Sequence, residues 1–128
     1  MKIIEAKDHQ AASQDNPAVL APANDVDPSE LSLAGVTRID LTFPKFTDGR
    51  AYSQAYLLRR RLGFQGEIRA VGDVLIDQLV QMSRTGFDVA VLRAGVDIAD
   101  AQRQFDRFSG FYQADAVNAK PVFARQGA

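Results

Sequence analysis

The feature that most constrains the fold is an alternation, from residue 36 onward, between short apolar segments and longer segments with helical periodicity. Strands rich in β-branched and aromatic residues are expected at 36–43, 67–71 and 87–92. Amphipathic helices are expected at 50–62, at 73–85 and from Asp97 onward. Because such alternation is typical of parallel sheets, we predict an α/β fold: a single compact domain with a small, largely parallel sheet flanked by helices.

The two ends of the chain differ from this central region. Residues 1–16 are polar, so we expect a mobile N-terminal segment that contains one short strand at residues 2–6. Residues 17–113 are expected to form the α/β domain, with Asp27 and Pro28 beginning a brief helix that ends near residue 35. Residues 114–128 show no periodicity and are expected to form a loose C-terminal tail.

The composition excludes several kinds of active site. The chain has no cysteine, which excludes disulfides, thiolate catalysis and cysteine-ligated zinc or iron–sulfur clusters. Its one histidine, His9, lies in the polar N-terminal segment, where we expect it to be exposed to solvent. A two-histidine metal centre and a Ser-His-Asp triad are therefore not expected, and we assign neither a metal site nor a catalytic residue.

Motifs for cofactors and for membranes are also missing from the sequence. Neither a G-x-G-x-x-G fingerprint nor a phosphate-binding P-loop is present, so no cofactor is assigned, although flavin and NADPH stay open as alternatives. No apolar run approaches the roughly 20 residues of a membrane span, and no secretion signal is evident. We therefore expect a cytoplasmic protein without a membrane partner.

Charge is unevenly distributed, although the net charge is only −1. Residues 1–35 carry six acidic and two basic residues, whereas the rest of the chain carries ten acidic and thirteen basic residues. The densest basic group, Arg59, Arg60 and Arg61, is either a solvated helix face or a docking patch for an acidic partner. A sequence pI of about 5.7 gives no broad phosphate-binding field, which argues against a nucleic-acid partner.

Ligands of open parallel sheets bind beyond the carboxyl ends of the strands, which here directs attention to residues 43–50. This segment lies between a predicted strand and a predicted helix. Its backbone N–H groups, together with Lys45 and Arg50, are suited to a small oxyanion such as sulfite or to a partner carboxylate. Asp48 either caps the helix or pairs with Arg50, and Ser53 borders the same region. Alternatively, Asp48 and Gly49 satisfy the geometry of a turn and nothing more.

A second candidate site is the pair Asp73 and Asp77. We expect Asp73 to cap the helix over 73–85 and Asp77 to follow one turn later on the same side. Two carboxylates in this position can perform acid–base chemistry or bind a metal, and the helix dipole would also stabilise them without any chemistry.

Three strings carry a family resemblance: FPKFTDGRAYSQAYLLRRRLGFQGEIRAVGDVLIDQL, RTGFDVAVL and FDRFSGFYQ. They lie within residues 39–113, and they resemble the bacterial domain-of-unknown-function 934 family. The family is commonly described as a probable oxidoreductase of sulfite reduction, so the resemblance implies a setting beside assimilatory sulfite reductase. Relatives often carry cysteine where this chain has Thr85, which implies that a shared role does not need that sulfur. Among the candidates above, the family pattern falls on Asp48, Gly49, Arg50, Ser53, Arg59, Asp73 and Asp77.

Electron transfer needs a cofactor or a redox side chain, and this chain has neither a cysteine nor a dinucleotide-binding loop. We therefore expect an accessory protein that docks on the sulfite reductase haemoprotein or supports electron delivery to it. The three consecutive arginines and the loop at residues 45–50 are the two candidate docking surfaces. A flavin- or NADPH-dependent oxidoreductase and a small oxyanion-binding module are the alternatives.

Overall fold

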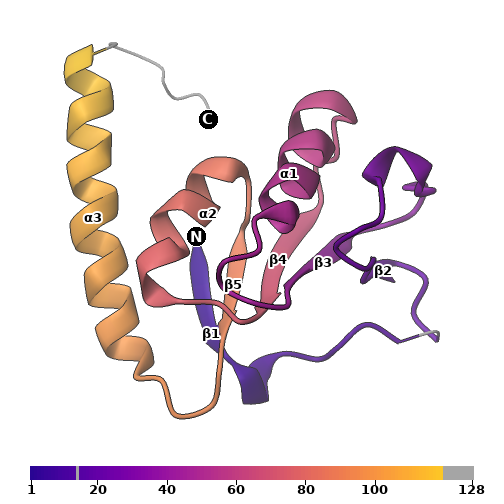
Figure 1. The fold of residues 1–128 in the computed structure, drawn as a ribbon, viewed down its shortest axis with the longest axis horizontal. Helices are drawn as coiled ribbons and strands as arrows, with labels where there is room; N and C mark the ends of the chain where they lie inside the picture. Colours follow the sequence, from indigo (N-terminus) through magenta and orange to yellow (C-terminus); the bar gives the residue numbers. More distant parts are fainter. Residues whose placement is uncertain (14, 120–128) are drawn as a thin grey trace.

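Five parallel strands form one sheet in the spatial order β1-β5-β4-β3-β2 (Figure 1). The structure is a computed structural model that describes residues 1–13 and 15–119, with side chains described as far as residue 108. The strands are β1 (Lys2–Glu5), β2 (Val19–Leu20), β3 (Arg38–Phe43), β4 (Glu67–Gly72) and β5 (Val89–Leu92). The predicted α/β class is confirmed, and every strand pair is parallel.

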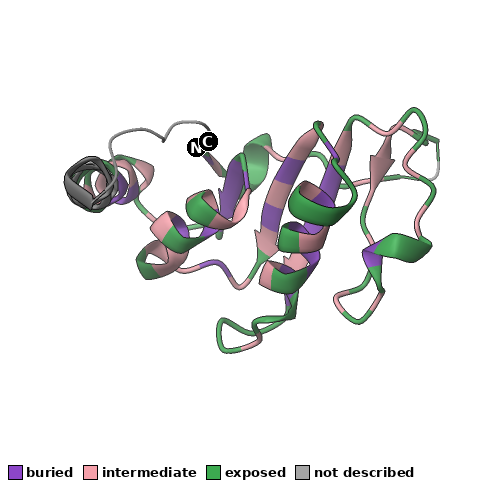
Figure 2. Ribbon diagram, turned by 90° about the horizontal axis from the view of Figure 1, so that it is seen from above, coloured by how far each residue is buried: buried purple, intermediate pink, exposed green. Residues whose placement is uncertain are grey.

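Helices cover one face of the sheet, and a longer helix lies at its β1 edge (Figure 1, Figure 2). Helix α1 (Arg50–Tyr56) continues into a π-helical turn, η3 (Leu57–Arg61), and a 3-10 turn, η4 (Ile76–Gln78), leads into α2 (Leu79–Thr85). Figure 2 shows α1 and α2 on the same side of the sheet. Helix α3 (Ile98–Ala119) lies beyond the β1 edge, beside α2 (Figure 1). It extends beyond residue 113, where the sequence predicts a tail, and residues 120–128 lie outside the described part of the chain.

The strand order explains which face each connection covers. From β2 to β5, each strand is followed by its neighbour in the same direction across the sheet, so right-handed crossovers place η2 (Pro28–Glu30), α1 and α2 on one face. The step from β1 to β2 spans the whole sheet in the opposite direction. Residues 6–13 and 15–18 therefore lie on the side of the opposite face, where His9 contacts side chains of β3 and β4.

Alternating side chains divide β3 between these two faces. Ile39, Leu41 and Phe43 are fully buried under α1 and α2, and they form the centre of the core. The Phe43 ring packs against Tyr52 of α1 at 5.0 Å and against Phe87 at 5.7 Å between ring centroids. The intervening side chains of β3 point to the opposite face, which is polar.

Two of the predicted helix boundaries are wrong. The helix expected at 73–85 begins only at Ile76, because Asp73 turns toward another loop instead of capping it. The helix expected after Asp27 is the single 3-10 turn η2, although the Asp27 carboxylate accepts a hydrogen bond from the Ser29 N–H as a cap does. The expected caps at residues 27 and 97 are confirmed, since Asp97 accepts from the Ala99 N–H.

Among the described residues, no helix combines the length and the apolar character needed to cross a lipid bilayer.

Gly72 ends β4, and its backbone lies close to the last residue of β3. Its φ is +94°, and a Cβ there would lie 2.5 Å from the Phe43 carbonyl oxygen. We predict that Gly72→Ala lowers the free energy of unfolding by about 3 kcal/mol, through left-handed strain plus the backbone clash. Gly35 is the matched control, because its φ is +76° but nothing lies within 4 Å of its added Cβ. Gly35→Ala should cost about 1 kcal/mol in urea unfolding, and equal costs would contradict the role of the clash.

Candidate functional site

The loops that follow β3, β4 and β5 are connected to one another at the carboxyl edge of the sheet. The Asp73 carboxylate accepts a hydrogen bond from the Phe46 N–H at 2.9 Å, and the Gln78 amide donates to the Phe46 carbonyl at 2.7 Å. The backbone N–H and carbonyl of Phe46 are therefore both bound by side chains of the segment that joins β4 to α2. We call Phe46, Asp73 and Gln78 the Phe46 clamp.

The third loop joins the clamp through Asp73. Arg93, which follows β5, places its guanidinium 3.2 Å from the second oxygen of the Asp73 carboxylate. The Asp73 N–H donates to the Phe43 carbonyl at 2.7 Å, just beyond the positive-φ turn at Gly72. Asp73 is thus a bridge between three loops, and the prediction that it caps a helix is wrong because its carboxylate is directed to Phe46.

The clamp fixes a backbone but leaves an aromatic ring in solvent. The Phe46 side chain is 49% exposed, although its main chain is held on both sides. The ammonium group of Lys45 beside it forms no hydrogen bond or ion pair with any group in the described part of the chain. An exposed ring on a fixed backbone loses little conformational entropy when it binds, which suits it to contact with another molecule.

Asp48 pairs with Arg50, as one of the two sequence interpretations expects. The Arg50 Nε and Nη2 atoms lie 3.2 and 3.0 Å from the two Asp48 oxygens, and the Arg50 N–H donates to the same carboxylate. Asn24 also donates to Asp48, at 2.9 Å. The Arg50 hydrogen bonds hold the pKa of Asp48 below its ordinary value.

This pairing bears on the predicted oxyanion site. Two backbone N–H groups of the loop, those of Phe46 and Arg50, already donate to the chain's own carboxylates. An external oxyanion would have to approach both Asp48 and Asp73. Gly49 precedes α1, and its carbonyl accepts from the Tyr52 N–H. Ser53 is exposed on α1.

The structure gives Asp73 and Asp77 different surroundings. Asp73 belongs to the Phe46 clamp, whereas Asp77 lies in η4 and lines a cavity shared with α3. Among the described residues, no group of three or more acidic or histidine side chains is placed to hold a metal ion. The sequence could not separate these two carboxylates, because it predicts one continuous helix through both.

The three consecutive arginines have three different environments. Arg59 is mostly buried; it donates to the carbonyls of Phe64, Gly66 and Gly86 at 2.7–3.0 Å and pairs with Asp88. The Asp88 carboxylate also accepts from the Ile68 N–H. Arg59 therefore stabilises the loops at the amino ends of β4 and β5. Of the predicted docking patch, Arg60 and Arg61 are exposed, and the Arg60 guanidinium lies 5.3 Å from the centre of the Tyr56 ring.

A charged cluster on the opposite face of the sheet was not found from the sequence. Asp40 is only 2% exposed and is bound by both Arg38 Nε and Nη2 at 2.9 Å. His9 contacts side chains of both β3 and β4. Its Nδ1 is 3.0 Å from Arg69 of β4, which pairs with Glu67, and its Nε2 is 3.7 Å from Asp40 of β3. The expectation that His9 is exposed is wrong, because the segment that contains it crosses this face. The one available signal was charge at alternate strand positions.

The sequence matches the model of a known protein family. A family model described as "Bacterial protein of unknown function (DUF934)" matches residues 18–123, which is most of the chain. No curated protein matches the chain.

Removing Arg59 is expected to destabilise the fold. We predict that Arg59→Ala lowers the free energy of unfolding by about 3 kcal/mol, because several carbonyls and one carboxylate lose a charged donor. Arg61→Ala is the matched control and should change it by less than about 0.5 kcal/mol. Similar effects of the two substitutions in urea unfolding would show that the Arg59 contacts contribute nothing.

His9 is expected to make stability depend on pH. Burial, opposed by Asp40 and aided by Arg38 and Arg69, lowers the pKa of His9 below 6.5. As pH falls, His9 therefore binds its proton at a higher pH in the unfolded state than in the folded state. The free energy of unfolding decreases as pH drops through 6.5 toward the lower folded-state pKa. Unfolding free energies measured between about pH 5.5 and 7.5 should show this slope, and His9→Gln should reduce it. An unchanged slope in the variant would contradict the assignment.

Proposed function

The chain belongs to the DUF934 family of bacterial proteins, and on this premise we propose that it is an accessory protein of assimilatory sulfite reduction. In this proposal it acts in the cytoplasm, docks on the sulfite reductase haemoprotein and supports electron delivery to that enzyme. The observation that carries the proposal is the Phe46 clamp, which fixes the loop after β3 while its aromatic ring stays exposed.

The chemistry of the chain supports docking more than catalysis. Without cysteine, the polypeptide supplies no thiol–disulfide couple of its own. Of the two carboxylates that the sequence offers for acid–base chemistry, Asp73 binds Phe46 and Arg93. In the neighbouring loop, Asp48 binds Arg50. Such pairs hold loops in place, which is what a docking surface requires.

The exposed groups beside the clamp favour an acidic partner surface. Lys45 contributes a positive charge next to the Phe46 ring, while the neighbouring Asp48–Arg50 and Asp73–Arg93 pairs balance their own charges. Aromatic anchors contribute much of the energy of protein interfaces, and a charge at the rim accelerates encounter. Transient redox assemblies bury little surface, under about 1,200 Å² in total.

A second docking surface is available at the other end of α1. Tyr56 is 47% exposed, nearly the same as Phe46, and it lies under the Arg60 guanidinium. Arg61 and Leu62 are exposed beside it. Tyr56 therefore provides a control with matched exposure for the role of Phe46.

We predict that the purified protein binds immobilised sulfite reductase haemoprotein and that Phe46→Ala weakens binding at least about tenfold, as expected for an aromatic anchor. Tyr56→Ala should change the affinity less than about twofold if docking uses the clamp. The reverse ranking would assign docking to the arginine-rich end of α1. No binding by the unmodified protein would contradict the proposed function.

A further inference from the structure

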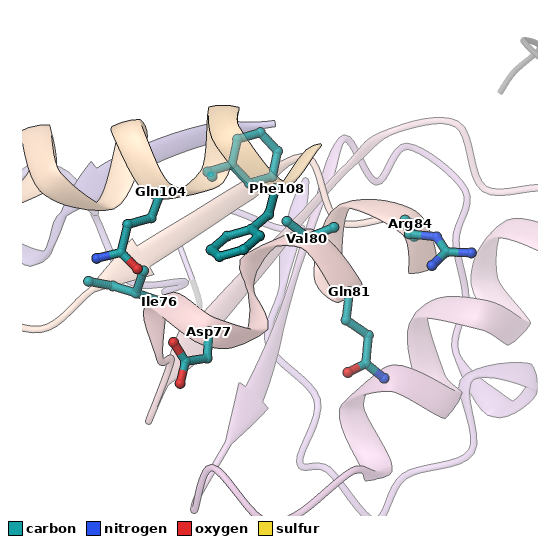
Figure 3. Close-up of a pocket in the computed structure, with 8 residues that line it drawn as sticks. Ile76, Asp77, Val80, Gln81, Arg84, Gln104 and Phe108 are labelled. Carbon is teal, nitrogen blue, oxygen red and sulfur yellow. The ribbon is translucent and has the colours of Figure 1, made fainter. Parts of the chain in front are cut away.

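A cavity of about 540 Å³ separates η4 and α2 from α3. Its size lies in the range of small-molecule sites. It is distinct from the Phe46 clamp, and the proposed function does not depend on it. Figure 3 shows its lining: Ile76, Asp77, Val80, Gln81, Arg84, Gln104, Phe105 and Phe108.

One end of the cavity carries hydrogen-bond acceptors. Asp77 and Gln104 lie near each other there, on opposite walls (Figure 3). The Gln104 Nε2 donates to the Asp100 carboxylate at 3.0 Å, which leaves the Gln104 carbonyl oxygen as an acceptor. The Asp77 carboxylate is exposed and forms no hydrogen bond or ion pair with any group in the described part of the chain. This end is therefore suited to a positively charged donor.

The middle of the cavity is apolar. Ile76 and Val80 follow one another at helical spacing on one wall, and Phe105 and Phe108 contribute the other. The Phe108 ring is 47% exposed, and the Arg107 guanidinium lies 5.5 Å from its centre. The ring thus already attracts a cation of the chain itself.

The positive charges near the cavity define where a bound cation would lie. Arg84 lines the cavity two helical turns after Asp77, and Gln81 lies between them on the same side of α2. Arg107 is on α3, outside the lining. A cation is therefore favoured at the Asp77 end and disfavoured at the Arg84 end.

We propose that this cavity binds a small organic cation, an ammonium or guanidinium group carried on an apolar stem. The charged head lies against the Asp77 carboxylate and the Gln104 carbonyl oxygen. The stem lies along Val80 and the Phe108 ring.

Three probes that share a phenethyl group and differ in charge test this proposal: phenethylammonium, 2-phenylethanol and 3-phenylpropionate. Each is titrated into the full chain and followed by amide chemical shifts in two-dimensional NMR. We expect phenethylammonium to bind about tenfold more tightly than the alcohol, with the largest shifts at the lining residues, and the carboxylate to bind most weakly. Asp77→Asn should remove the preference for the cation over the alcohol, and Phe108→Ala should weaken both.

Asp106→Asn is the control for a general charge effect. Asp106 is an exposed acid on α3 that bonds to Gln102 and lies outside the cavity lining, so its loss should leave the preference unchanged. The proposal is overturned by equal affinity for cation and carboxylate, by an Asp77→Asn variant that keeps the preference, or by no shifts with any probe at millimolar concentrations.

Discussion

Parallel pairing of every strand is the constraint on which the rest of the structure depends. Parallel strands end at the same edge, so the loops after β3, β4 and β5 must lie next to one another. Asp73 uses that proximity: it bonds to the Phe46 N–H on one side and to Arg93 on the other. The order of the strands has a second consequence, because the step from β1 to β2 crosses the sheet and places His9 against Asp40 and Arg69.

Charged side chains in this protein mainly hold segments in place. Arg59 binds three carbonyls around the amino ends of β4 and β5, and Arg38 satisfies the buried Asp40. Several charged candidate site residues already bind other groups of the chain. Buried or half-buried charged groups are stable only when they are paired. The Lys45 ammonium and the Asp77 carboxylate have no such partner in the described part of the chain. They lie at the two places where we propose contact with other molecules.

The sequence predicted the parts of the fold that depend on local pattern. The apolar runs that became β3, β4 and β5, the caps at Asp27 and Asp97 and the Asp48–Arg50 pair follow from neighbours a few residues apart. It missed features that depend on long-range contacts. Asp73 has the spacing of a helix cap but bonds to Phe46, 27 residues earlier, and His9 in a polar segment contacts Arg69, 60 residues later. Strand order, which creates both contacts, has no local signal.

Docking through the Phe46 clamp requires that the Phe46 backbone is fixed before any partner arrives. Amide hydrogen exchange of Phe46 in the isolated protein tests it most directly, because a loop N–H exchanges at its intrinsic rate unless it is hydrogen-bonded. We predict that the Phe46 amide is protected in the unmodified protein and loses that protection in Asp73→Ala, while amides in β3 keep theirs. Exchange of the Phe46 amide at the intrinsic rate in the unmodified protein would show that the clamp does not hold in solution.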